Sequence, residues 1–101
     1  MSPVNLFDVA SRLPAAWRSQ TLGQVGTACV KVLRMDELPV EEEAHRVAEA
    51  LIVLDGSLEL VVDGAPMTAG PGELCLVPAG ARHAVRPGSR GTLLIVEVPE
   101  S

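Results

Sequence analysis

Short turn signals recur through the second half of this chain and divide its apolar sequence into segments too short for typical helices. They are Asp55-Gly56, Asp63-Gly64, Gly70-Pro71-Gly72, Pro78-Ala79-Gly80 and Pro87-Gly88. Asp-Gly between apolar segments is a strong hairpin signal, because glycine tolerates the positive φ that a type I′ turn requires. Short strands at spacings of about 8 to 12 residues are typical of an all-β sandwich or barrel.

The segments expected to form strands have apolar residues in alternation or in continuous runs. They are residues 21–25, 28–35, 49–56, 58–64, 73–80, 83–88 and 92–98. The N-terminal region differs, because its apolar residues follow a helical stripe over Leu6–Leu13, with Asn5 placed to cap the helix and Pro14 to end it. We therefore predict one all-β domain over residues 20–101, preceded by a helix and connector over residues 1–19.

Composition and charge narrow the possible partners. The chain has 101 residues, which is enough for one domain, and 48% of them are hydrophobic with only two aromatic residues, Phe7 and Trp17. The formal net charge is −5 and the basic residues are scattered. A nucleic-acid backbone or an anionic membrane surface would repel such a chain, so we expect neither as a partner.

The cellular compartment is predicted from the cysteines and the N-terminus. Cys29 and Cys75 lie far apart in apolar segments without metal-ligand spacing, so we interpret them as buried, reduced thiols. The N-terminus has no basic stretch followed by an apolar one, and no apolar run reaches about 18 residues. These features favour the cytoplasm.

The two histidines, His45 and His83, are the candidate site residues. Glu43 and His45 are two residues apart, so on an extended segment their side chains share one face. Glu49 has the same parity, but on a straight strand it would lie roughly 20 Å from Glu43. The chain is therefore predicted to bend between His45 and Glu49, which lets Glu49 begin the next strand and face inward with His45. His83 shares its parity with Val85 and points inward if that face is the interior.

Residues 40–87 resemble the two-motif signature of the cupin superfamily, in the form found in compact single-domain microbial members. The first motif has His-x-His, three or four residues, Glu, six residues and Gly, and this chain matches it with Glu43, His45, Glu49 and Gly56. Glu43 thus stands where the motif has its leading histidine, and the motif's opening glycine has no counterpart.

The second cupin motif has Gly, five residues, Pro-x-Gly, two residues, His, three residues and Asn. The matching residues here are Gly72, Pro78, Gly80 and His83, and Pro87 stands in place of the asparagine. The resemblance implies a cupin-type double-stranded β-helix, which is a jelly-roll barrel, behind the short N-terminal α-helix.

The resemblance also implies a metal site. In metal-binding cupins the ligands are the histidines and glutamate of the first motif and the histidine of the second. Carried over to this chain, they are His45, Glu49 and His83, with Glu43 as a substituted ligand that can still coordinate. Two imidazoles with carboxylates suit a divalent transition metal such as Fe, Mn, Ni, Cu or Zn. The alternative is that these side chains only line the pocket of a metal-free barrel.

For function, the resemblance is less specific than for fold, because cupins include oxygenases, isomerases, decarboxylases, storage proteins and ligand-binding modules. We interpret the chain as a small cupin with one divalent metal in the barrel. If it is an enzyme, we expect oxygenase-like chemistry on a small oxygen-rich organic molecule. The alternatives are a non-enzymatic cupin that binds or senses a small ligand without metal, and a purely structural module. Glu43 is the only candidate for acid–base chemistry, and only if it is not a ligand.

Two further expectations concern packing. Trp17 is expected to pack the N-terminal segment onto the barrel, in preference to the alternative of stacking on a ligand. The strand segments at residues 50–54 and 93–96 are apolar on both faces, although a barrel this small needs only one apolar face for its interior. The other face requires a second layer, which a symmetric partner supplies most simply. We therefore predict a homodimer.

Overall fold

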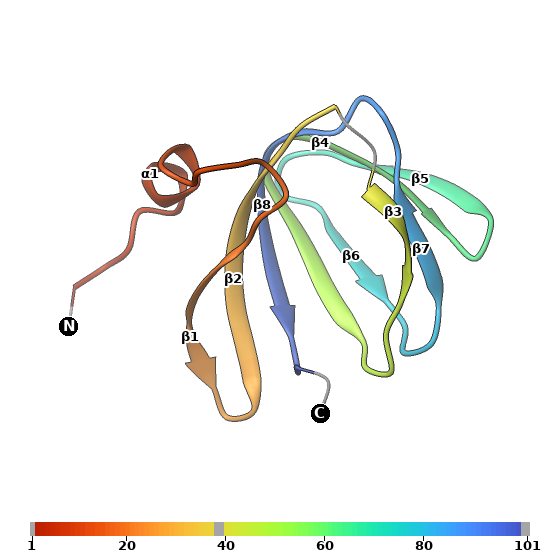
Figure 1. Cartoon of the computed structure of the whole chain (residues 1–101), viewed down its shortest axis with the longest axis horizontal. Helices are drawn as coiled ribbons and strands as arrows, with labels where there is room; N and C mark the ends of the chain where they lie inside the picture. Colours follow the sequence, from red (N-terminus) through yellow and green to blue (C-terminus); the bar gives the residue numbers. More distant parts are fainter. Residues whose placement is uncertain (1, 38–39, 100–101) are drawn as a thin grey trace.

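The computed structural model describes residues 2–37 and 40–99 (Figure 1). Within these residues one short helix, α1 (Leu6–Ser11), precedes eight strands. The strands are β1 (Gln20–Val25), β2 (Ala28–Met35), β3 (Val40–Ala44), β4 (Glu49–Val62), β5 (Ala65–Ala69), β6 (Leu74–Val77), β7 (Arg82–Val85) and β8 (Arg90–Glu97). None of the helices in the described part of the chain is long and apolar enough to cross a membrane.

The helix begins where the sequence predicts. The Asn5 side chain accepts a hydrogen bond of 3.0 Å from the backbone N–H of Asp8, which satisfies one of the free donors of the first turn. The regular helix ends at Ser11, two residues earlier than predicted. Arg34 on β2 then holds this end of α1, because its guanidinium donates to the carbonyl oxygen of Ala10 at 2.8 Å.

The long strand β4 connects two antiparallel layers. Its first half pairs with β6 on one side and β8 on the other, and β8 continues the layer through β2 to β1. Its second half pairs with β5 and β7, and β7 pairs with β3. Figure 1 shows β1, β2 and β8 facing β3 and β7 across the interior. This arrangement is the all-β jelly roll with a short N-terminal helix that the sequence predicts.

One predicted turn is wrong. Asp55-Gly56 lies inside β4, where the register against β8 shifts between Val53 and Asp55. The Asp55 side chain accepts a hydrogen bond from the backbone N–H of Thr92 at 2.6 Å, and Gly56 has φ of 78°. A Cβ on Gly56 would overlap the carbonyl oxygen of Arg90. The dipeptide therefore forms a bulge that bends β4 from one layer into the other, rather than a hairpin.

The second Asp-Gly pair forms the hairpin that the sequence predicts. Asp63 and Gly64 have φ of 47° and 80°, as a type I′ turn requires, and they join β4 to β5. The sequence analysis missed β5 itself. This strand contains Pro66 and is exposed at every position except Ala69, so its pattern does not resemble a buried strand.

The core lies between the two layers and is aliphatic, in a chain with only two aromatic residues. Its buried members are Leu33, Met35, Leu51, Val53, Leu58, Leu60, Ala69, Val77, Ala81 and Leu93. Trp17 packs against this core, which confirms its expected role in joining the N-terminal segment to the barrel. Cys29 and Cys75 are free thiols, and Cys29 is buried as expected, whereas Cys75 is partly exposed.

Candidate metal centre

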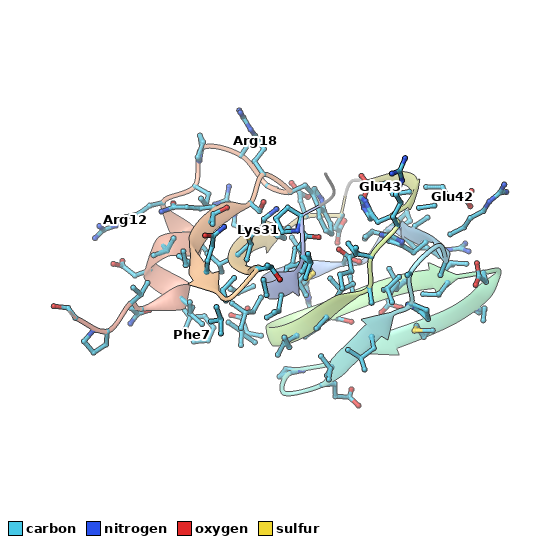
Figure 2. All side chains as sticks on the ribbon, turned by 90° about the horizontal axis from the view of Figure 1, so that it is seen from below. Phe7, Arg12, Arg18, Lys31, Glu42 and Glu43 are labelled. Atoms are coloured by element: carbon cyan, nitrogen blue, oxygen red, sulfur yellow. The ribbon has the colours of Figure 1, made fainter. Side chains whose placement is uncertain are left out.

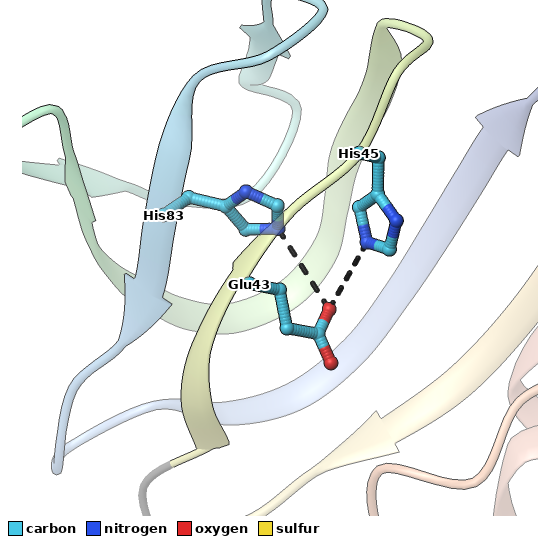
Figure 3. Close-up of side chains that lie close together, drawn as sticks. All are labelled: Glu43, His45 and His83. Atoms are coloured by element: carbon cyan, nitrogen blue, oxygen red, sulfur yellow. Dashed lines mark hydrogen bonds and ion pairs between the residues drawn. The ribbon is translucent and has the colours of Figure 1, made fainter.

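The strand pair β3–β7 brings the first two site residues together. Glu43 and His83 are partners in the antiparallel register, so their side chains lie side by side on one face. His45 follows β3 and has the same parity as Glu43. Glu43 Oε2 lies 3.1 Å from His45 Nε2 and 4.0 Å from His83 Nε2 (Figure 3). One ligand atom from each of the three residues lies within 4.8 Å of the other two.

The predicted bend after His45 is present. β3 ends at Ala44 and β4 begins at Glu49, so the direction of the chain reverses over a few residues. The backbone N–H of Gly80 donates to the carbonyl oxygen of His45 at 2.6 Å. This bond fixes the bend against the Pro-x-Gly turn at 78–80. It thereby connects the segment of the first motif to the segment of the second.

Glu49 lies beside the three-residue cluster but is not one of its members. Its Oε1 is 3.1 Å from His83 Nε2, and its side chain is only 10% exposed. Burial, together with a hydrogen bond to Glu97, raises the pKa of Glu49 to about 7. The structure thus places the substituted residue, Glu43, in the cluster with both histidines. It sets Glu49 beside this cluster, in contact with His83.

Glu97 and Lys31 extend this polar group, and the sequence analysis missed both. Glu97 is the register partner of Glu49 on β8, and Lys31 Nζ on β2 lies 2.6 Å from Glu97 Oε1. Burial opposes the ionisation of Glu97, but the hydrogen bonds from Lys31 and Glu49 outweigh it and lower its pKa. The pKa of Lys31 is raised, chiefly by its bond to Glu97. One signal was available in the sequence, since Glu97 directly follows the apolar run of residues 93–96.

The acidic and imidazole side chains of this group lie along one cavity of about 230 Å³ between the two layers. Glu43, His45, Glu49, His83 and Glu97 line its polar part. The rest of the wall is largely aliphatic and includes Leu33, Leu51, Leu60, Val85, Leu93 and Ile95. His83 is only 7% exposed, so the site combines a buried imidazole with an opening large enough for a small molecule.

The donor set fits a metal ion. Two imidazole nitrogens and a carboxylate oxygen form a mixed nitrogen–oxygen group, which first-row divalent metals favour over softer or harder ions. The three ligand atoms already converge within 4.8 Å, so a common ion requires only small side-chain movements. The arrangement therefore has the chemistry of a candidate metal site.

Comparison with known proteins identifies the family. The family model of the cupin domain matches residues 34–99, which contain both halves of the site. The chain belongs to the cupin family. No match emerges among curated protein sequences.

Solved structures of other proteins have the same architecture. A cupin-2 domain protein from Shewanella frigidimarina NCIMB 400 is 21% identical with a TM-score of 0.85, and the match covers 95% of this chain and 94% of that one. A protein of unknown function from Rhizobium leguminosarum bv. viciae 3841 is 26% identical with a TM-score of 0.80, covering 99% and 98%.

An enzyme is also among the similar structures. Hydroquinone 1,2-dioxygenase from Sphingomonas sp. TTNP3 is 26% identical with a TM-score of 0.85, and the match covers 98% of this chain but 33% of the enzyme. Its structures contain 4-nitrophenol in one case and 4-hydroxybenzoate in another. This chain is therefore similar to one third of a larger protein that binds single-ring phenols.

Proposed function

We propose that this cupin binds one divalent transition metal ion through Glu43, His45 and His83, with Glu49 as the adjacent fourth ligand. The observation that carries the proposal is the convergence of the first three residues within 4.8 Å on the wall of the cavity. When bound, such a metal supplies a Lewis acid with open positions for O₂ or for an oxygen atom of the organic molecule.

The residues of the chain have distinct tasks in this proposal. Neutral imidazoles donate nitrogen lone pairs, and the Glu43 carboxylate lowers the net charge of the ion that it binds. Glu49, with its pKa raised to about 7, is partly protonated at neutral pH and must lose that proton before it can coordinate. Lys31 keeps Glu97 ionised beside it. The aliphatic wall binds the apolar part of the small molecule and excludes water from it.

We further propose oxygenase-like chemistry on a small oxygen-bearing molecule of single-ring size. The similarity to hydroquinone 1,2-dioxygenase, which extends over 98% of this chain, supports this choice. The cavity volume also supports it, because an aliphatic cavity of roughly 150 Å³ suffices to bind benzene.

The second candidate function is a non-enzymatic cupin that binds or senses a small ligand without metal. One observation favours it, since the contacts His45–Glu43 and His83–Glu49, both at 3.1 Å, already give each imidazole a carboxylic partner. The two candidates differ in whether the purified protein contains metal in a fixed ratio to the chain.

The test is elemental analysis of protein purified without a histidine tag, followed by calorimetric metal titration. We expect about one ion per chain in the native protein and none in His83→Ala. Glu43→Gln is expected to weaken binding about tenfold or more. Glu42→Gln is the matched control, because Glu42 is the exposed neighbour of Glu43 on the other face of β3. Native metal content in the His83 variant would contradict the proposed site.

Assembly and location complete the proposal. We propose that residues 20–101 form one barrel domain behind the helix and connector of residues 1–19, and that two copies form a homodimer. Exposed apolar side chains on the outside of β6 support this assembly, with Leu74 at 53% and Leu76 at 68% exposure. The free thiols Cys29 and Cys75 suit the reducing cytoplasm.

A further inference from the structure

The connector between α1 and β1 holds Trp17 against β2. The backbone N–H of Trp17 donates to the carbonyl oxygen of Arg34 at 2.9 Å. The guanidinium of Arg34 in turn donates to the carbonyl oxygens of Ala10 and Leu13, at 2.8 and 3.3 Å. Trp17 has φ of 66°, a conformation that non-glycine residues rarely adopt and that surrounding structure must maintain. Trp17 therefore has a fixed position.

Trp17 borders the cavity as well as the core. Its side chain packs against the core cluster, and the residue lines the cavity together with Leu33 and Leu93. The indole nitrogen Nε1 is fully buried, without a hydrogen-bond partner in the described part of the chain. A molecule in the cavity cannot reach that atom. The surface that the indole presents to the cavity therefore consists of carbon atoms.

This aromatic carbon surface differs from the rest of the apolar wall. The other apolar residues that line the cavity are Leu33, Leu51, Leu60, Ala84, Val85, Leu93 and Ile95, which are all aliphatic. Aliphatic side chains contact a flat ring and a saturated ring of the same size alike. A pair of aromatic rings gains an attraction beyond the area that it buries. Trp17 is thus the apolar wall residue that can favour an aromatic ligand.

We propose that Trp17 is a specificity-determining residue, whose indole carbons pack against the ring of an aromatic molecule bound in the cavity. This inference rests on the organic-ligand part of the proposed function but does not require the metal. The volume of about 230 Å³ limits the ligand to one substituted ring, since roughly 150 Å³ suffices for benzene.

Charge narrows the ligand further. The polar part of the cavity contains Glu43, Glu49 and Glu97, and the chain has a formal net charge of −5. Several anionic groups on one ligand would be repelled unless a metal neutralised them. The ligand class is therefore a single-ring aromatic molecule with no more than one anionic group.

The first experiment compares two probes that differ in the ring alone. They are 4-hydroxybenzoate and its saturated analogue, trans-4-hydroxycyclohexanecarboxylate, titrated by calorimetry into the protein as purified. The measured quantity is the dissociation constant of the saturated probe divided by that of the aromatic probe. We expect this ratio to fall about fivefold in Trp17→Leu, because leucine fills part of the space without an aromatic surface. Trp17→Phe keeps an aromatic ring and should retain most of the preference.

The ratio separates recognition from packing. A loss of core packing in Trp17→Leu weakens both probes together and leaves their ratio unchanged. Phe7→Leu is the control that should keep the native ratio, because Phe7 lies on α1 and is 51% exposed, at the other end of the molecule from Glu43 (Figure 2). A ratio that falls less than twofold in Trp17→Leu overturns the inference.

The second experiment observes the contact directly and uses the fact that Trp17 is the only tryptophan. Protein deuterated except at the tryptophan ring is saturated with 4-hydroxybenzoate, and nuclear Overhauser effects from the ligand protons are recorded. We expect them to reach carbon-bound protons of the indole and not the proton on Nε1, which is buried. A bound ligand without any such effect on the indole overturns the inference and leaves the proposed ligand binding intact. If neither probe binds the native protein, the organic-ligand part of the proposed function fails, and the role of Trp17 fails with it.

Discussion

The two faces of the β2–β8–β4 layer have similar apolar sequences but different environments. On the inner face, the row formed by Leu33, Leu93 and Val53 is buried in the core. On the outer face, Val96 and Ala50 are partly exposed, and the same row continues into the largely exposed Leu76 on β6. Alternation along each strand explains how one apolar segment supplies both faces.

The faces differ most at the end of the layer where β4 begins. There the inner face presents Glu49 and Glu97 side by side, with Lys31 bonded to Glu97. The outer face stays apolar. Buried ionisable side chains cost free energy and persist where function or pairing maintains them, whereas an exposed apolar row indicates a surface that packs against something. The inner face therefore indicates chemistry and the outer face indicates assembly.

The largest expected effect comes from removing side-chain volume on the inner side. Leu93 in the inner row is buried, so Leu93→Ala should lower the free energy of unfolding by about 2–5 kcal/mol. Leu76→Ala is the matched substitution on the outer face and should cost less than about 1 kcal/mol within one subunit. Urea denaturation at low protein concentration measures both. Equal losses of unfolding free energy in the two variants would mean that the inner and outer faces are packed alike.

Much of the site was predictable because its signals are local. The spacing of Glu43, His45 and Glu49 required a bend, and a Pro-x-Gly turn before His83 set the direction of its strand. Those patterns place Glu43, His45 and Glu49 on one face without knowledge of the tertiary structure, whereas they place His83 with them only if its own face is the interior. They do not reveal which carboxylate joins the histidines, since that depends on the β3–β7 register, which pairs Glu43 with His83.

The unpredicted features depend on contacts between distant segments. The glycine of an Asp-Gly pair can supply positive φ in a hairpin turn and in a bulge alike. At Gly56 a bulge forms because β8 approaches the glycine closely. The bond between Glu49 and Glu97 joins strands far apart in sequence, so parity within one strand does not predict it. The unpaired indole N–H of Trp17 depends on three-dimensional packing, although the packing of its ring was predictable.

The outer face offers the next test, through the proposed homodimer. Leu76→Glu places a charge in the middle of the exposed apolar row, and we expect it to convert dimers into monomers at micromolar concentration. Light scattering should then report half of the native mass. Glu73→Ala, at an exposed position just before β6, is the control that should leave the mass unchanged. A native protein with the monomer mass would contradict the homodimer directly.

The smallest expected effect is a change in the pH dependence of stability that originates on the inner face. Because the pKa of Glu49 is raised from 4.5 to about 7, its protonated form stabilises the metal-free fold. That contribution is complete below about pH 4.5 and is lost as the pH rises through 7. Glu97 has a lowered pKa, so its contribution is lost only below pH 4.5, outside this window.

Glu49→Gln isolates this contribution, because glutamine keeps a donor for the bond to Glu97 but cannot ionise. In chelator-treated native protein we expect the melting temperature to fall by a few degrees between pH 5 and pH 8, and to fall less in Glu49→Gln. Titrating groups that do not contact Glu49 contribute equally to both proteins and cancel in the comparison. Glu42→Gln, at an exposed site on β3, should retain the native slope. Identical slopes in native protein and Glu49→Gln would show that Glu49 ionises as freely as a surface carboxylate, and the contrast between the two faces would then rest on packing alone.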